Sequence, residues 1–314
     1  MISVIIPHLD QPEMLRKCLA SLTREINPRL SVEIIVVDNG SNPLPTEVCA
    51  AFPNVRLLSE PVPGPGPARN LGVLHAVGDI LAFIDADCIA AEGWLLEIEH
   101  QFSRNTQKSI LGGDVRIQCE NPSRPTLLES YESVFAYRMK EYIAKQGFTG
   151  TGNLAVRAEV FASIGGFGGI DIAEDRDWGQ RALQRGYRTY YCPGMVVYHP
   201  ARKTLGELAQ KWDRHTAHDF ARLKARRGWW VLWILRAAAI AVSPIAEVTR
   251  IGSSDRLRGW RARVLAFAGV VMVRSYRSGI MLALAFGASA PNLSQRWNRK
   301  ASMALPRGTS KARS

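Results

Sequence analysis

Short apolar runs alternate with segments of helical spacing through about residue 120, and this alternation leaves few folds open to the chain. The apolar runs are SVIIP, EIIVVDNGS, NVRLLSE and DILAFIDAD, and two of them are nearly continuous. Continuous apolar strands are typical of sheets that helices cover on both faces. Residues 11–24 and 67–77 have helical spacing, and Pro67 suits a first helical turn. The pattern predicts an α/β fold with a parallel sheet.

Further along, residues 126–145 have the spacing of one long helix and are followed by the glycine-rich GFTGTGNLAVRAEVFASIGGFGG. Glycine at this density indicates either a backbone that approaches another group closely or a mobile loop. We expect a helix over 174–185, a strand over 187–198 and a helix over 204–226. This organisation predicts a first domain over 1–220, a helical, amphipathic extension over 221–293, and a basic, disordered tail over 294–314.

Charge is distributed unevenly between the two parts of the chain. Residues 1–200 carry 18 basic and 23 acidic residues, whereas residues 201–314 carry 22 basic and 5 acidic residues. A basic segment of this kind can meet nucleic acid, an anionic membrane surface or an acidic partner, and charge alone does not choose among them.

The cysteines and the N-terminus indicate the compartment. Five scattered cysteines without CxxC spacing favour neither a disulfide framework nor a thiolate metal site, so a reducing compartment is expected. The first ten residues have no basic segment before their apolar run, which Pro7 interrupts. We therefore expect a first strand here and not a signal peptide.

Carboxylates follow the apolar runs. Asp38 comes after EIIVV, and Asp85 and Asp87 come after ILAFI. Ligands of open α/β sheets bind beyond the carboxyl ends of the strands. Two carboxylates about 4 Å apart repel by roughly 1 kcal/mol in water and roughly 4 kcal/mol at an effective dielectric of 20, and a divalent cation removes this cost. Oxygen ligands suit Mg²⁺ or Mn²⁺. Alternatively, Asp85 caps the next helix and Asp87 is a solvated loop residue, because a bare DxD also occurs by chance.

Six blocks in order carry a more specific signal than any one motif. They are VIIPHLDQPEMLRKCLASL, EIIVVDNGS, GPGPARNLGVLHAVGDILAFIDADC, TGNLAVRAEVFASIGGF, AEDRDWGQRALQRGY and VVYHP. Together they resemble the family 2 glycosyltransferases of the GT-A fold, over roughly residues 1–220. The resemblance implies a GT-A type nucleotide-binding sheet flanked by helices, here with a C-terminal basic helical extension.

The resemblance also implies how the nucleotide is bound. Residues at the end of the first strand and the acid after the second strand bind the nucleotide in that family, which matches Pro7, His8 and Asp38. The arginine of the ARN block, Arg69, contacts it as well. Physically, Arg69 is expected to open a helix, whose N-terminus favours anions. Asp85 would meet the ribose or base.

The metal and the catalytic base are implied in the same way. Asp87 would bind the metal that bridges the two phosphates, and His199 would complete the metal site. A histidine at a strand end is otherwise more often structural. The acid motif of the family points to Asp175 as the base, with Glu174 and Asp177 as neighbouring candidates. From the residues alone, these three acids could equally stabilise a helix dipole.

The implied activity is an inverting transfer from a nucleotide-diphosphate sugar, by family frequency a UDP-sugar, to an acceptor hydroxyl, with Mn²⁺ or Mg²⁺ as cofactor. The acceptor would be a glycan or a lipid-linked molecule. Processive members carry a QxxRW block, which QKWDRH at 210–215 does not match, so polymerisation is not expected. We expect a cytoplasmic enzyme at the cytoplasmic face of the membrane.

The C-terminal extension contains two apolar stretches, 229–248 and 264–287, which are interrupted by arginines and by Pro244. On one helix, Arg256, Arg263, Arg274 and Arg277 would fall within about 60° of one another. This predicts a helix lying in the plane of a membrane with its arginines toward anionic headgroups. Packing on the first domain, a dimer interface and a true membrane span are the alternatives.

Two features of the sequence suggest other functions. GPGPARN suggests a NAD-dependent oxidoreductase, but it follows the third strand and lacks the last glycine of GxGxxG. The basic segment suggests a nucleic-acid-binding protein, but no reader fold accompanies it, so no nucleic-acid partner is expected.

Overall fold

The computed structural model describes residues 1–26, 30–105, 107–170, 172–225 and 227–287. The chain divides into two compact units: Met1–Gln118 with Phe135–Pro200, and Cys119–Val134 with Ala201–Ser314. This division differs from the expected boundary at residue 220, because the second unit begins directly after residue 200 and also includes residues 119–134. The expected basic tail, 294–314, lies outside the described residues.

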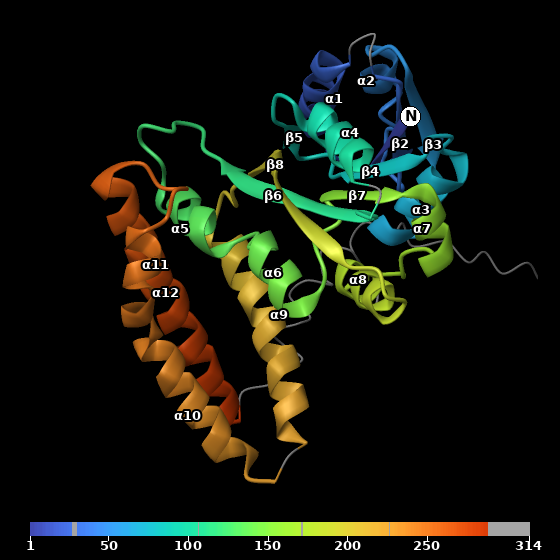
Figure 1. Ribbon diagram of the computed structural model, residues 1–314. Coiled ribbons are helices and arrows are strands. Elements are labelled where there is room, and N and C mark those ends of the chain that lie inside the picture. The colour runs from blue at the N-terminus through green and yellow to red at the C-terminus, as the bar shows by residue number, and fades with distance from the viewer. Residues whose placement is uncertain (27–29, 106, 171, 226, 288–314) are drawn as a thin grey trace, which may run out of the picture. The chain divides into compact units, whose positions relative to one another are not determined.

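The first unit is built on an eight-stranded sheet with the order β3-β2-β1-β4-β7-β6-β8-β5 (Figure 1). The strands are β1 (Ile2–His8), β2 (Val32–Asp38), β3 (Val55–Ser59), β4 (Ile80–Ile84), β5 (Ile89–Ala90), β6 (Ile110–Gln118), β7 (Asn153–Arg157) and β8 (Thr189–Pro200). β3, β2, β1 and β4 are parallel, as predicted. Beyond β4 the sheet is mixed, because β7 runs antiparallel to both its neighbours. β7 comes from the glycine-rich segment, which the sequence did not mark as a strand.

Helices cover both faces of the sheet, which explains the continuous apolar strands. One face carries α1 (Pro12–Glu25), α2 (Thr46–Ala50) and α4 (Trp94–Arg104), and the other carries α3 (Pro65–His75), α7 (Ala158–Ile164) and α8 (Glu174–Gln184). In β1, Val4 and Ile6 pack with Leu19 of α1, whereas Ile5 packs with Phe161 of α7. All five are at most 4% exposed, and each such burial stabilises the fold by about 1.5–3 kcal/mol.

The single helix predicted over 126–145 is two helices, α5 (Leu127–Phe135) and α6 (Met139–Gln146). Between them Tyr137 has a φ of +42°, in the left-handed region that aromatic residues rarely adopt. The chain passes from the second unit to the first at this break. Hydrophobic spacing continues across the break, so the spacing alone could not reveal it.

The second unit packs α9 (Leu205–Lys224), α10 (Trp229–Val242), the 3-10 turn η1 (Ser243–Glu247), α11 (Val248–Gly252) and α12 (Gly259–Ala285) together (Figure 1). Phe220, Trp233 and Met281 form its core, and the Trp233 indole N–H donates to the Met281 carbonyl at 2.7 Å. Pro244 ends the α-helical hydrogen bonding between α10 and α11, as its position in the sequence predicts.

The arginines of this unit do not form the outward polar face that the sequence predicts. Arg256 precedes α12 altogether. Arg274 donates to Glu247 at 3.1 Å, and the Arg277 guanidinium lies 4.0 Å from the centre of the Trp212 ring. Both arginines contact protein groups, because long side chains on α12 reach the neighbouring helices.

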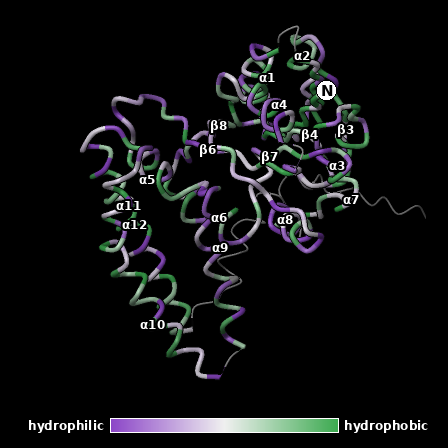
Figure 2. The backbone as a smooth tube through the Cα atoms, viewed as in Figure 1, coloured by the Kyte–Doolittle hydropathy of each residue, from purple (hydrophilic) through white to green (hydrophobic). Residues whose placement is uncertain are grey.

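Apolar side chains are exposed on α10 and α12 instead, and Figure 2 shows hydrophobic residues recurring along both helices. The exposed group includes Trp230, Leu232, Leu235, Trp260, Val264 and Phe267. Two continuous helical stretches, Trp229–Gly252 and Gly259–Ala285, have the length and composition of membrane spans, although core helices and signal sequences pass the same test.

Candidate active site

Asp85 and Asp87 lie directly after β4, where the sequence places them. Their carboxylate oxygens and the Cys88 sulfur lie within 4.8 Å of one another. Burial, helped by the charges of Asp85 and Asp87, raises the pKa of Cys88 well above its ordinary value, so the thiol stays protonated and is a poor ligand. The two carboxylates are 36% and 24% exposed, so the oxygen donors are the ones that an incoming cation can reach.

His199, near the end of β8, faces Asp87. Its Nε2 lies 3.3 Å from Asp87 Oδ2, and its Nδ1 lies 2.7 Å from the Pro200 carbonyl oxygen. A carbonyl only accepts, so Nδ1 carries a hydrogen, and Nε2 of the neutral ring has a lone pair to which the Tyr137 hydroxyl, 2.9 Å away, can donate. A proton or a metal ion at Nε2 would make the contact with the Asp87 carboxylate attractive. A histidine that donates its other N–H to a carbonyl is also the usual form of a metal ligand.

The titration of these two groups reflects the same contact. Burial acts to lower the pKa of His199, but the hydrogen bond and charge of Asp87 raise it overall. Burial likewise acts to raise the pKa of Asp87, and the His199 contact lowers it overall. Each group therefore favours its charged form, as expected for a histidine in contact with a carboxylate.

Arg69 connects the carboxylates after β4 to those of α8. Its Nη2 donates to Asp85 Oδ1 at 2.6 Å, and its Nη1 donates to Glu174 Oε1 at 3.2 Å. The side chain is only 4% exposed, and within the described residues its Nε has no hydrogen-bond partner. Arg69 does not open its helix, contrary to expectation, because α3 begins at Pro65 and Arg69 lies in the second turn. Its contact with acids comes from its side chain and not from a helix terminus.

Three acids open α8, and their partners distinguish them. Glu174 pairs with Arg69, and Asp177 pairs with Arg181 at 2.9 Å. Among the described residues, Asp175 forms no ion pair; its Oδ1 accepts the Arg176 backbone N–H at 2.6 Å. Burial, followed by the charge of Glu174, raises the pKa of Asp175 against the opposing effects of the Arg176 N–H and Arg69. A carboxylate without a counter-cation and with a raised pKa is suited to accept a proton.

His8 and Asp38, at the ends of β1 and β2, form a buried pair. His8 Nε2 accepts the Gln11 backbone N–H at 3.2 Å, so Nδ1 carries the hydrogen and donates to Asp38 Oδ1 at 2.9 Å. Burial acts to raise the pKa of Asp38, but hydrogen bonds from Ser41, His8 and the Gly40 N–H lower it overall. Both side chains are inaccessible and occupied by internal partners, whereas Pro7 is partly exposed. The pair fixes the loop after β2 and presents no free polar atom of its own.

The glycine-rich segment supplies a close approach at Gly152. A Cβ on Gly152 would lie 2.4 Å from Asp85 Oδ2, so a side chain here would force the Asp85 carboxylate to move. Close backbone approach, one of the two expectations for this segment, is therefore confirmed at Gly152. The other expectation, a mobile loop, does not hold for the part of the segment that forms β7 and α7.

The GPG turn is closed by packing. A Cβ on Gly66 would lie 2.0 Å from the Gly168 carbonyl oxygen, and Asn70 exchanges two hydrogen bonds with the backbone of Phe167. Backbone from the segment before α8 occupies the space that a dinucleotide fingerprint would leave for a pyrophosphate, which argues against the oxidoreductase alternative.

Comparison with known proteins identifies the family. Residues 3–165 match the sequence model of glycosyl transferase family 2. The chain is also 35% identical over 219 residues to glycosyltransferase AglE of Haloferax volcanii, a match covering 68% of this chain and 71% of that protein. This chain belongs to glycosyl transferase family 2. The pre-mycofactocin glycosyltransferase of Mycobacterium tuberculosis is 26% identical to this glycosyltransferase over 224 residues, 67% of this chain but only 45% of that protein.

Solved structures show the same fold. The mannosyltransferase PcManGT of Pyrobaculum calidifontis, in complex with GDP-Man and Mn²⁺, aligns with a TM-score of 0.51 at 18% identity, covering 98% of this chain and 81% of that chain. Staphylococcus aureus TarS 1–349, in complex with UDP-GlcNAc, aligns with a TM-score of 0.51 at 14% identity, covering 88% of this chain and 92% of that chain. The predicted α/β sheet of the GT-A type, flanked by helices, is confirmed.

Two contacts in the site of this glycosyltransferase involve residues that the sequence does not single out. The Tyr137 hydroxyl lies 2.9 Å from His199 Nε2, although the sequence predicts Tyr137 in the middle of a helix. Gly152 touches Asp85 from a segment 67 positions later in the chain. The strained backbone at Tyr137 leaves no signal in hydrophobic spacing, whereas glycine density did point to the second contact.

Proposed function

We propose that this glycosyltransferase moves a sugar from a nucleotide-diphosphate sugar to an acceptor hydroxyl with inversion at the anomeric carbon. One observation carries the proposal: Arg69 bonds both Asp85 and Glu174, which brings the carboxylates after β4 beside the acid motif of α8. In a transfer reaction, the site that binds the leaving group and the catalytic base must lie within about the length of one sugar of each other. UDP is proposed as the carrier.

Asp87 and His199 would hold a divalent ion, Mn²⁺ or Mg²⁺. Their fit rests on the oxygen donors after β4 and on a histidine whose lone pair faces Asp87 across 3.3 Å. Such an ion would supply a Lewis acid that neutralises charge on the departing diphosphate. The Tyr137 hydroxyl lies 2.9 Å from the same ring nitrogen and helps to hold the ring in place.

Of the residues predicted to bind the nucleotide, Pro7, Arg69 and Asp85 are proposed to contact it, whereas His8 and Asp38 are buried in a pair of their own. Asp85 is one-third exposed and offers an acceptor for a ribose or base, while Arg69 holds it in place. His8 and Asp38 support the proposal indirectly, because their buried pair shapes the loop that follows β2.

Asp175 would act as the base. It would take the proton of the acceptor hydroxyl as that oxygen attacks the anomeric carbon from the face opposite the diphosphate, which departs with the electron pair of the broken bond. The raised pKa of Asp175 brings its proton affinity closer to working pH. The neighbouring acids are already paired with Arg69 and Arg181, which leaves Asp175 for this role.

The acceptor is proposed to be a glycan or a lipid-linked molecule at the cytoplasmic face of a membrane. Exposed apolar side chains on α10 and α12, with the basic excess of residues 201–314, support a role at an anionic membrane surface. The same charge excess comes with no nucleic-acid reader fold, so nucleic acid is not proposed as a partner.

A donor screen tests the proposal. Nucleotide-sugars are added with and without Mn²⁺, and thermal stabilisation and release of the nucleoside diphosphate are measured. A donor at 100 times its dissociation constant would stabilise the enzyme by about 2.7 kcal/mol. Asp87→Asn should lose the part of the stabilisation and of the nucleotide release that depends on Mn²⁺. Asp79→Asn, which changes an exposed acid, should keep both. If no nucleotide-sugar stabilises the enzyme or turns over, the proposal fails.

A further inference from the structure

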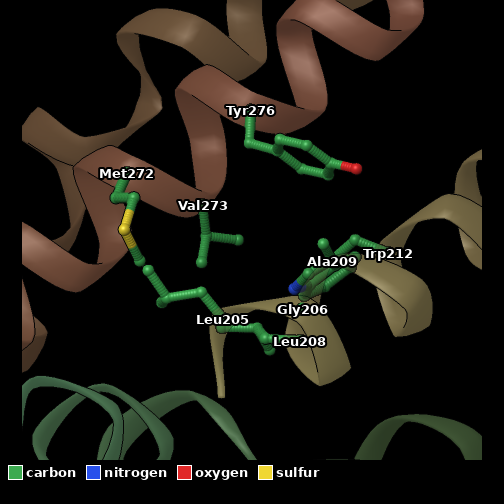
Figure 3. A pocket seen from close by; sticks show the side chains of 8 residues that line it. All are labelled: Leu205, Gly206, Leu208, Ala209, Trp212, Met272, Val273 and Tyr276. Atoms are coloured by element: carbon green, nitrogen blue, oxygen red, sulfur yellow. The ribbon is translucent and has the colours of Figure 1, made fainter.

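An apolar cavity of about 310 Å³ lies between α9 and α12 in the second unit (Figure 3). Ala209 and Trp212 of α9 form one wall, and Val273 and Tyr276 of α12 form the other. Apolar cavities of roughly 150 Å³ stay dry and accept a molecule of the size of benzene. A cavity of twice that volume therefore has room for a hydrocarbon chain of about a dozen carbons.

A cation that forms no ion pair within the described residues adjoins this cavity. The Arg277 guanidinium lies against the Trp212 ring, 4.0 Å from its centre. Its neighbours Arg236 and Arg274 are paired, with Asp219 at 2.7 Å and with Glu247 at 3.1 Å.

Arg277 itself forms no ion pair within the described part of the chain, and its Nε is buried without an acceptor. Burial, with the charge of Arg274, lowers the pKa of Arg277 to about 10, against the opposing effects of Tyr131 and Asp219. The cost of burying this charge is only partly offset, so an anion brought to Arg277 would be bound favourably.

A second unmet donor lies on α9. Thr216 is four residues after Trp212, on the same side of the helix, and is 2% exposed. Its hydroxyl has no hydrogen-bond partner among the described residues. A phosphate has several acceptor oxygens, so one group could bond the guanidinium of Arg277 and the hydroxyl of Thr216.

We propose that the helical unit binds a membrane lipid that bears a phosphate, with its hydrocarbon chain in the cavity and its phosphate at Arg277 and Thr216. A soluble phosphate would leave the apolar cavity unused, and a neutral lipid would leave Arg277 without an anion. Exposed apolar side chains on α10 and α12 suit helices that lie against hydrocarbon, where such a lipid is available. The site lies wholly in the second unit, so it depends on neither the donor nor the metal proposed above.

Titration of the full chain with dodecyl phosphate tests the proposal by calorimetry, below the concentration at which the amphiphile forms micelles. Dodecyl maltoside supplies the same chain without the charge, and inorganic phosphate supplies the charge without the chain. We expect one dodecyl phosphate per chain, bound about tenfold more tightly than dodecyl maltoside, because a charge-assisted hydrogen bond is added. Inorganic phosphate should not saturate the site.

Two pairs of variants separate the contributions. Arg277→Gln should weaken dodecyl phosphate about tenfold, to the level of dodecyl maltoside, whereas Arg261→Gln, an exposed arginine of the same helix, should change nothing. Val273→Trp fills the cavity and should abolish binding of both amphiphiles, whereas Val271→Trp, on the exposed side of α12, should not.

Ala209→Phe fills the same cavity from a partly exposed position on α9. If Val273→Trp unfolds in urea more readily than the parent, Ala209→Phe replaces it as the variant with a filled cavity. Three results would each overturn the proposal: inorganic phosphate binding as tightly as dodecyl phosphate, equal affinities of the two arginine variants, or unchanged binding in Ala209→Phe. Nucleotide-sugar turnover is measured on the same samples, so failure of this site and failure of the donor assignment are read separately.

Discussion

Replacing Gly152 by alanine should displace the Asp85 carboxylate and so disturb the candidate active site. The added Cβ would lie 2.4 Å from Asp85 Oδ2 and 2.9 Å from its Cγ, so the carboxylate must move. Asp85 Oδ1 accepts from Arg69 Nη2 at 2.6 Å, and a shift of the carboxylate breaks or stretches this bond. Arg69 would then keep Glu174 as its remaining partner.

The size of the effect follows from burial. A hydrogen bond between charged groups contributes about 1.5–3 kcal/mol when buried. Arg69 is 4% exposed but Asp85 is 36% exposed, so solvent screening reduces the value to roughly 1–2 kcal/mol. We expect Gly152→Ala to lower the free energy of unfolding by about this amount and to weaken donor binding by roughly 5- to 30-fold.

Urea unfolding and calorimetric donor titration measure the two effects separately. Gly169→Ala is the matched control, because its added Cβ meets nothing within 4 Å and lies in the same glycine-rich segment. Equal stability and equal donor affinity in the two variants would refute the reasoning, since the close approach at Gly152 would then have no consequence. A stability loss without a loss of donor affinity would show that Asp85 is structural.

Three further changes have definite expected outcomes. Asp175→Asn should lower turnover by roughly 10²- to 10⁴-fold with donor affinity unchanged. In the parent enzyme the rate should fall on acidification at a pH above the ordinary carboxyl range, because the raised pKa of Asp175 protonates the base earlier. His199→Gln should weaken Mn²⁺ binding at least roughly tenfold, measured by the electron spin resonance of free Mn²⁺. Asn153→Ala should lower the free energy of unfolding in urea by about 3 kcal/mol, because it removes three buried hydrogen bonds that the Asn153 amide makes.

Each of these changes has a control of the same residue type. Asp177→Asn removes an acid already paired with Arg181 and should retain most turnover. His100→Gln, on the exposed side of α4, should leave Mn²⁺ affinity unchanged. Asn105→Ala removes an exposed amide and should cost less than 1 kcal/mol. Should a control match its partner variant, the assigned role belongs to neither residue.

The sequence predicts the parallel half of the sheet because the two patterns that mark it, apolar runs and helical spacing, each lie within a short stretch of the chain. Short apolar runs mark β1, β2, β3 and β4, and helical spacing marks α1 and α3. β7 was missed because Asn153–Arg157 is short and sits in a glycine-rich setting, where pairing with β4 and β6 decides its conformation. The break near Tyr137 was missed because tertiary contacts overrode a spacing that continues across it.

The direction of the C-terminal arginines was wrong for a related reason. A helical wheel places residues around one helix but does not say which side meets another helix. Arg274 and Arg277 lie toward Glu247 and Trp212, so the exposed side of α12 is apolar. The expected polarity of the exposed surface is thereby reversed, although a membrane surface remains the environment we propose for it.

The carboxylates of this site differ in their chemistry because they have different positively charged partners. The sequence does not show which partner each carboxylate has. Asp85 and Glu174 share the single charge of Arg69, and each is held in one position by it. Asp87 faces a histidine that can give way to a metal ion, because His199 already donates its other N–H to a carbonyl. Asp175 is left with a backbone N–H and a raised pKa. The spacing of residues along the chain indicates all of these acids as candidates, but only the distribution of cations around them distinguishes the proposed anchor, metal ligand and base. That distribution depends on one buried arginine that reaches two segments of the fold at once.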